Sequence, residues 1–179
     1  VMTGTYKPTS GTDRAASFQL KNGVQVYGGF NGTETDRIQR NPAVNATILS
    51  GDLKGNDNAI ESTRSDNSYH VVSGATGATL DGFTISGGNA NGSGELANGG
   101  GLYNHAASPM LSNLIFEGNS AASSGAGMYN ASGSAPTITR TIFANNKSSD
   151  KGGGLANNFS SPTITDVTFS GNSASNGGG

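Results

Sequence analysis

Apolar residues in the second half of the chain occur in short runs that repeat at nearly constant spacing. The segment GGGLYN from Gly99 recurs as GAGMYN from Gly125 and GGGLAN from Gly152, and three glycines at 177–179 begin a fourth copy, so that the spacings are 26, 27 and 25 residues. In each repeat a second apolar run follows a proline, and a third run contains a phenylalanine. Runs of this length, rich in β-branched and aromatic residues and bounded by Gly, Asn, Ser or Pro, are typical of short strands separated by turns.

Three short strands in every repeat of about 26 residues predict an all-β fold, a right-handed parallel β-helix with three strands per coil. An α-helix is not favoured, because glycine interrupts every segment before a 3.6-residue period is established. A propeller blade would need about 40 to 50 residues, and leucine-rich repeats have a different Leu and Asn pattern. Over residues 1–179 we expect one β-helix domain of six to seven coils.

Stacked coils bring equivalent residues of successive repeats over one another, about 4.8 Å apart. We expect four interior stacks: Leu102, Met128 and Leu155; Leu80, Leu111, Ile138 and Ile164; Phe83, Leu114, Thr141 and Val167; and Ile85, Phe116, Phe143 and Phe169. Two amide ladders are also expected, one of Asn119, Asn146 and Asn172 and one of Asn104, Asn130 and Asn157, the first interrupted at Gly88. We interpret both ladders as structural, because turns in this architecture favour asparagine.

The chain must bend between the second and third stacks of each coil. Gly82, Asn113 and Asp166 occupy this bend, and these residue types tolerate a left-handed backbone. Arg140 occupies the same position in its repeat and has no explanation at the level of the sequence.

Residues 1–68 lack the regular repeat that begins at residue 69. Short apolar segments at 16–20, 24–30, 47–49 and 69–72 predict two or three irregular coils with protruding loops at 31–45 and 52–67. Most of the charge lies in or beside these loops: Asp36, Arg37, Arg40, Asp52, Asp57, Glu61, Arg64 and Asp66. Loops on a rigid scaffold are common binding sites.

Composition excludes several classes of function. Charged residues make up only 12% of the chain, the formal net charge is −2 and the pI is about 5.5, so no basic surface is expected for nucleic acid or anionic lipid. The absence of cysteine excludes disulfides and thiolate metal sites. No apolar run is long enough to cross a membrane, so we expect no membrane insertion by this segment and any export signal to lie upstream of it.

Two sets of motifs resemble known bacterial β-helix proteins. The F-x-x-N segments Phe116–Asn119, Phe143–Asn146 and Phe169–Asn172, with the Gly-Gly motifs, resemble the repeats of polymorphic outer-membrane proteins. The segments GTYKPT from Gly4, VYGGFNGTETDR from Val26 and TILSGD from Thr47 are similar to the opening coils of bacterial secreted proteins of the pectate-lyase-like superfamily. The resemblance implies an internal piece of a large exported or surface-anchored protein, often presumed to be an adhesin, and it transfers no catalytic residue.

Candidate catalytic groups do not converge in the repeats. Glu117, Asp150 and the bend residues Asp166 and Arg140 occupy different repeat positions, so we expect these groups to scatter over different faces and not to converge. Neither His70 nor His105 has a recognisable nucleophile motif nearby. The segment 52–58 offers oxygen ligands from Asp52 and Asp57, but it lacks the closing Glu of an EF-hand, and a solvated polar turn is favoured. We therefore expect no catalytic residue, no metal ligand and no cofactor.

Our leading hypothesis is that the chain is a non-enzymatic extracellular surface or matrix component, adhesin-like, whose β-helix acts as a rigid stalk. Its partners would be further copies of itself, stacked end to end, or a surface glycan or protein. The alternative is a carbohydrate-binding or polysaccharide-lyase β-helix that acts through the loops at 31–45 and 52–67. A row of exposed aromatic residues or a calcium cluster would favour that alternative. The sequence leaves open the ligand, the length and anchor of the parent protein, the oligomeric state, and whether calcium binds near Asp52 and Asp57. Ice or mineral binding by flat threonine arrays is disfavoured, because Met110-Leu111-Ser112 breaks the array.

Overall fold

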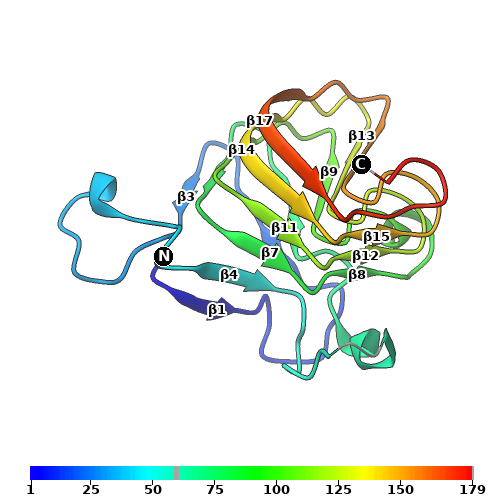
Figure 1. Ribbon diagram of the computed structural model, residues 1–179, viewed down its shortest axis with the longest axis horizontal. Coiled ribbons are helices and arrows are strands. Elements are labelled where there is room, and N and C mark those ends of the chain that lie inside the picture. Colours follow the sequence, from blue (N-terminus) through cyan, green and yellow to red (C-terminus); the bar gives the residue numbers. More distant parts are fainter. Residues whose placement is uncertain (59–60, 179) are drawn as a thin grey trace.

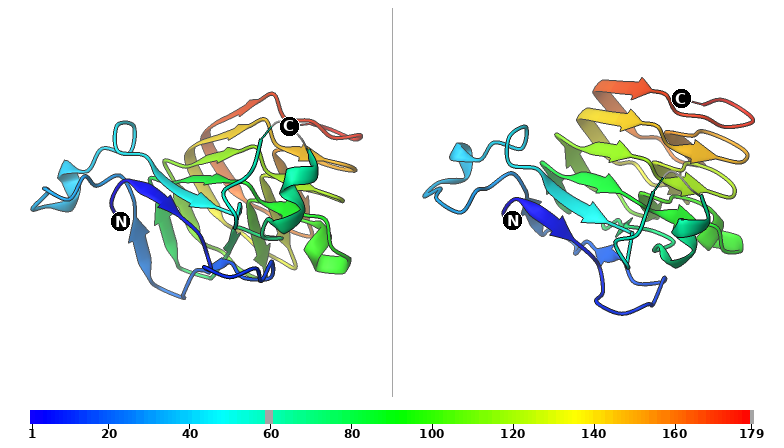
Figure 2. Two further views of the ribbon diagram at one scale, coloured as in Figure 1. Left: turned by 90° about the horizontal axis from the view of Figure 1, so that it is seen from below. Right: turned by 60° about the horizontal axis from the view of Figure 1, so that its bottom comes forward.

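The computed structural model describes residues 1–58 and 61–178. At residues 61 and 62 it describes the course of the backbone but not the side chains. It is an all-β parallel solenoid of about four turns, and the predicted fold class is confirmed (Figure 1). Every strand pair is parallel, and successive coils lie one above the other along the axis (Figure 2). Residues 59, 60 and 179 and the side chain of Glu61, which belong to predicted features, lie outside the described part.

The strands form three rows along the solenoid and a short fourth one. The first row contains β2 (Phe18–Gln19), β5 (Val72–Ser73), β9 (Leu102–His105), β13 (Met128–Ala131) and β16 (Leu155–Asn158). The second contains β3 (Gln25–Tyr27), β6 (Thr79–Asp81), β10 (Met110–Ser112) and the first parts of β14 (Thr137–Ala144) and β17 (Thr163–Ser170). The third contains β1 (Gly4–Tyr6), β4 (Thr47–Ser50), β7 (Thr84–Ser86), β11 (Ile115–Glu117) and the second parts of β14 and β17. The short row contains β8 (Asn89–Ala90), β12 (Ser120–Ala121) and β15 (Lys147–Ser148).

Helical structure in the described residues is limited to three short 3₁₀ segments in connections. These are η1 (Arg37–Gln39), η2 (Glu61–Asp66) and η3 (Gly94–Ala97). Within the described residues, no helix has the length and apolar character required to cross a membrane.

The predicted number of coils was wrong, since the solenoid has about four turns and not six to seven. Before β5 the chain completes a single coil, β2, β3 and β4, and β1 adds one strand below β4. The segments 31–45, 52–58 and 61–67 leave the coil as long connections and contribute no rungs to the ladder. The irregular first part of the chain therefore has more residues per coil than the regular repeat.

The bend between the second and third rows is left-handed at all four of its positions. The φ angles are 82° at Gly82, 51° at Asn113, 46° at Arg140 and 54° at Asp166. Arg140, unexplained in the sequence, is held by a hydrogen bond from its Nε to Asn113 Oδ1 of the coil below, at 2.9 Å. An arginine therefore occupies this strained position with its guanidinium fixed on the outer surface.

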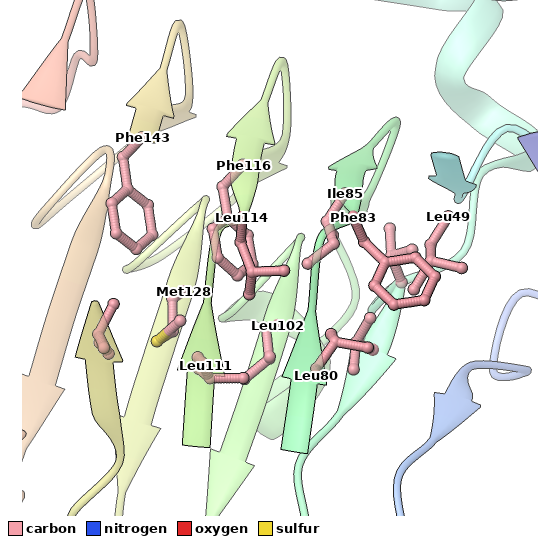
Figure 3. Packing of buried hydrophobic residues seen from close by; sticks show 13 residues of the cluster. Leu49, Leu80, Phe83, Ile85, Leu102, Leu111, Leu114, Phe116, Met128 and Phe143 are labelled. Atoms are coloured by element: carbon pink, nitrogen blue, oxygen red, sulfur yellow. The ribbon is translucent and has the colours of Figure 1, made fainter. Parts of the chain in front are cut away.

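The core is built from equivalent residues in register. Leu111 pairs with Leu80 and Ile138, and Phe116 pairs with Ile85 and Phe143. Figure 3 shows Leu80, Leu111, Ile85, Phe116 and Phe143 pointing into the solenoid. These five side chains and that of Ile138 are at most 1% exposed. The Phe116 and Phe143 rings are stacked with centroids 4.8 Å apart, and Phe169 follows at 5.0 Å. At the last coil Ile164 and Phe169 are about 40% exposed, because no described rung covers them.

One amide ladder runs through the interior beside the phenylalanines. Asn119 Nδ2 donates to Asn146 Oδ1, and Asn146 Nδ2 donates to Asn172 Oδ1, each at 3.0 Å. The same amides also donate to main-chain carbonyls, Asn119 to Ile85 and Asn146 to Phe116. At Gly88, where the asparagine series ends, the backbone N–H donates to Asn119 Oδ1 at 3.0 Å and replaces the missing side chain.

The second amide ladder lies in the first row. Asn104 Nδ2 donates to Asn130 Oδ1 at 2.7 Å, and Asn130 Nδ2 donates to Asn157 Oδ1 at 2.8 Å. Gly74 is the equivalent residue one coil earlier, and Asn104 Oδ1 fills the place where a Cβ at Gly74 would stand. This glycine therefore ends the ladder by admitting the asparagine side chain above it.

Phe143→Ala should lower the free energy of unfolding by about 3–5 kcal/mol, because Phe143 is fully buried between two rings. Phe169→Ala removes the same group at 39% exposure and should cost clearly less. Urea unfolding of both variants measures the difference, and equal midpoint shifts would contradict the stacking described here.

Candidate functional site

The loop at 31–45 connects β3 to β4 and projects from the side of the solenoid (Figure 1). Its tip is ordered by its own hydrogen bonds. Asp36 and Gln39 form a capping box around η1, and the Glu34 carboxylate accepts the N–H groups of Asn31 and Gly32 at 2.8 and 2.9 Å. These bonds satisfy backbone groups of the loop without contact to the coils.

Arg40 fastens this loop to the bend of the next coil. Its Nη2 lies 2.6 Å from Asp81 Oδ1, and its Nη1 donates to the Gly28 carbonyl at 3.1 Å. Pro42 lies against Gly82, where an added Cβ would come within 2.8 Å of Pro42 Cγ. Sequence analysis placed Arg40 among the loop charges, but the structure uses it as an anchor.

Asp81 is the centre of this anchor. Burial acts to raise its pKa, but hydrogen bonds from Asn113, Arg40 and Ser112 outweigh burial and lower the pKa below the usual value. Asn113 Nδ2 donates to Asp81 Oδ1 at 2.9 Å, and Asn113 Oδ1 accepts from Arg140. Arg40, Asp81, Asn113 and Arg140 thus form one continuous polar network that links four successive coils.

A groove of about 840 Å³ lies between the loop and the outer face of β11 and β14. One wall is the segment Asp36–Ala43, and the other side is formed by Asn113, Leu114, Ile115, Arg140 and Ile142. Ile142 is 41% exposed at this face, and Ile38 of the loop is 88% exposed. The groove therefore combines an aliphatic floor with arginine side chains.

Three of the ten lysine and arginine residues of the chain line this groove: Arg37, Arg40 and Arg140. Arg40 is paired with Asp81, whereas Arg37 and Arg140 form no ion pair among the described residues. The Arg37 guanidinium lies over the Tyr27 ring at 4.5 Å. The site offers two cationic groups without a partner carboxylate, although the whole chain is slightly acidic.

The loop at 52–67 uses its aspartates to hold its own backbone. Asp52 accepts the N–H groups of Gly55 and Asp57 at 2.7 and 3.0 Å, and burial, which raises its pKa, is outweighed by these bonds, which lower it. Asp57 accepts from Asn67 at 2.8 Å and lies 3.9 Å from Arg64, and burial raises its pKa. No group of three or more metal-ligating acids, histidines or cysteines is found among the described residues.

The four charged residues of the repeats that were considered as candidate catalytic groups lie in three different places. Glu117 lines a hollow of about 220 Å³ with Asp52, Asp57 and Arg64, a proximity that the repeat positions did not indicate. Arg140 lies in the groove, and Asp150 accepts a hydrogen bond from Asn176 Nδ2 at 3.0 Å. Asp166 occupies the bend one coil above Arg140.

The two histidines of the chain, His70 and His105, lie beside a column of aromatic rings that follows the first row of strands. His70 stacks on Tyr103 at 4.8 Å, and Tyr103 stacks on Tyr129 at 5.9 Å. Burial lowers the pKa of His70, whose Nδ1 lies 3.0 Å from the Gly99 carbonyl, and burial raises the pKa of Tyr103 to about 12. His105 is exposed, 3.9 Å from Glu95. A row of exposed aromatic residues would favour the carbohydrate-binding alternative, but the two faces of the Tyr103 ring are occupied by His70 and Tyr129.

The comparisons with known proteins agree with the repeat motifs. Residues 166–179 match the family model of the Chlamydia polymorphic membrane protein repeat. This segment contains the motif Phe169–Asn172, and the resemblance to such repeats is confirmed. No curated protein and no solved structure is significantly similar to the chain.

Arg40→Ala should release the loop from the bend and lower the free energy of unfolding by about 1–3 kcal/mol at pH 7. The cost arises because Asp81, 8% exposed, loses its cationic partner. A lowered carboxylate pKa stabilises the fold above the unfolded value of about 3.9, and this contribution disappears as the pH falls through the folded pKa. The difference between variant and wild type should therefore shrink below about pH 4.

Urea unfolding at several pH values measures this change, and thermolysin cleavage at Ile38 reports release of the loop. Arg37→Ala is the matched control, because Arg37 lies in the same loop and forms no ion pair among the described residues. If the two variants are cleaved at the same rate, Arg40 does not anchor the loop.

Proposed function

We propose that the chain is a rigid, non-enzymatic segment of a bacterial cell-surface protein that acts in adhesion. The match of residues 166–179 to a polymorphic membrane protein repeat carries the proposal and supports a location at the cell surface. The in-register coils support the role of a stalk, because each is hydrogen-bonded along its length to its neighbour, and such solenoids are stiff. The side groove supports a role in recognition.

Self-association is part of this proposal. The last described coil presents the outer edges of β16 and β17, which pair on one side only with β13 and β14, and it exposes Ile164 and Phe169. Unpaired strand edges and exposed apolar residues are a template either for further coils of a longer protein or for another copy of the chain, and we propose the second for the 179-residue chain by itself. Light scattering across a concentration series should show rods longer than one copy, and a strictly monomeric chain would contradict self-association.

The alternative function is carbohydrate binding or polysaccharide cleavage through the two loops. The groove beside the loop at 31–45 favours binding of an acidic sugar, since arginines are suited to carboxylates. The hollow that contains Glu117, Asp52, Asp57 and Arg64 is the place for acid or base chemistry in this reading. Asp52, however, directs both carboxylate oxygens to the backbone of its own loop.

Two readouts test the proposed function. Antibodies against the chain should label intact bacteria that express the parent protein, without permeabilisation, and labelling only after permeabilisation would contradict a surface location. The purified chain should release no unsaturated product from polygalacturonate or alginate, with or without calcium. Product formation that Asp52→Ala or Asp57→Ala abolished would replace the proposal with the lyase alternative.

A further inference from the structure

We propose that the groove beside the loop at 31–45 binds an acidic, aliphatic peptide segment of a partner protein. The inference deepens the proposed function and rests on it, because it assigns the recognition site of an adhesive surface protein. It is carried by the shape of the groove, by its unpaired arginines and by the chemistry of its floor.

The groove is held open by the fold itself. Arg40 and Pro42 fix the loop against the bend at Asp81 and Gly82, and the capping box of Asp36 and Gln39 holds its tip. The opposite side consists of β11 and β14, which are paired with strands on both sides. A ligand therefore meets a preformed site and does not have to order the loop, which lowers the entropic cost of binding.

The groove is lined by three arginines and one acidic residue, Asp36, and this excess of positive charge indicates an anionic ligand. Arg140 is exposed, and its Nε is used by Asn113, which orients the guanidinium and leaves its terminal nitrogens without a partner among the described residues. Arg37 on the opposite wall is exposed as well. Guanidinium groups bind carboxylates through paired hydrogen bonds, so two acidic groups can be held across the groove.

The floor indicates a peptide and not a sugar. Between the arginines lie Ile115 and Ile142, the latter 41% exposed, and Ile38 on the loop is 88% exposed. The Leu114 side chain is buried in the core and offers no surface to a ligand. No aromatic ring is among the residues that line the groove within the described part of the chain, whereas Tyr27 is covered by Arg37. Aliphatic side chains of a peptide bury apolar area against such a floor, while a sugar ring is better served by an aromatic face.

The probe is the blocked peptide Glu-Leu-Gly-Leu-Glu, titrated into the ¹⁵N-labelled 179-residue chain. Chemical-shift changes should concentrate at the backbone amides of Ile115 and Ile142 and grow with peptide up to about 1 mM. A peptide with Gln for Glu tests the charge, and one with Ser for Leu tests the aliphatic contact. Binding should weaken between about 0.1 and 1 M salt, because exposed charges are screened over about 10 and 3 Å respectively.

Arg140→Asn is the decisive variant. The equivalent residue one coil below is Asn113 at φ 51°, so asparagine suits the backbone and the fold is retained, as an unchanged thermal midpoint would show. Its affinity for the peptide should fall roughly fivefold, the loss of one partly exposed charge pair. Lys21→Ala removes the same charge from an exposed residue outside the groove and should leave the affinity unchanged.

Three results would overturn the inference: absence of shifts, equal binding of the Gln peptide, or equal binding by Arg140→Asn. Trigalacturonic acid is titrated in parallel, and its binding in the groove without binding of the peptide would assign the site to an acidic glycan. A failure here is separate from failure of the proposed function, because surface labelling of intact cells does not depend on Arg140.

Discussion

The structure depends on stacking identical side chains at the separation of neighbouring parallel strands. A buried asparagine is costly unless each of its polar atoms is paired, and a column of asparagines pairs itself, since each amide donates to the carbonyl oxygen of the next. Asn146 is an example, because its side-chain amide donates to Asn172 and to the Phe116 carbonyl, and its Oδ1 accepts from Asn119. The phenylalanines beside it stack by the same register.

Register also explains what happens where a column ends. Gly88 supplies a backbone N–H to Asn119, and Gly74 leaves room for the Asn104 side chain. The column of bend residues contains glycine, asparagine, arginine and aspartate, because this position selects a left-handed backbone and not a particular side chain. The side chains at the bend are therefore free to differ, and two of them, Asn113 and Arg140, line the groove.

The regular half could be predicted from the sequence because the same residue type returned after every coil. The stacks of Leu111 and Phe116 follow directly from that spacing. The first 68 residues have no such repeat. Their local sequence does not distinguish a polar strand of the solenoid from a polar loop that leaves it, so the number of coils was overestimated. The groove was beyond prediction for the same reason: Arg40 and Asp81 are 41 residues apart, and their pairing depends on where the loop returns to the coil.

Hydrogen exchange of the side-chain amides, followed by NMR, shows whether the interior amide column is continuous and buried. The Nδ2 protons of Asn119 and Asn146 should exchange far more slowly than those of exposed Asn41, with Asn172 intermediate because it is only partly buried. Exchange of Asn119 and Asn146 as fast as Asn41 would contradict the ladder and, with it, the register of the whole solenoid.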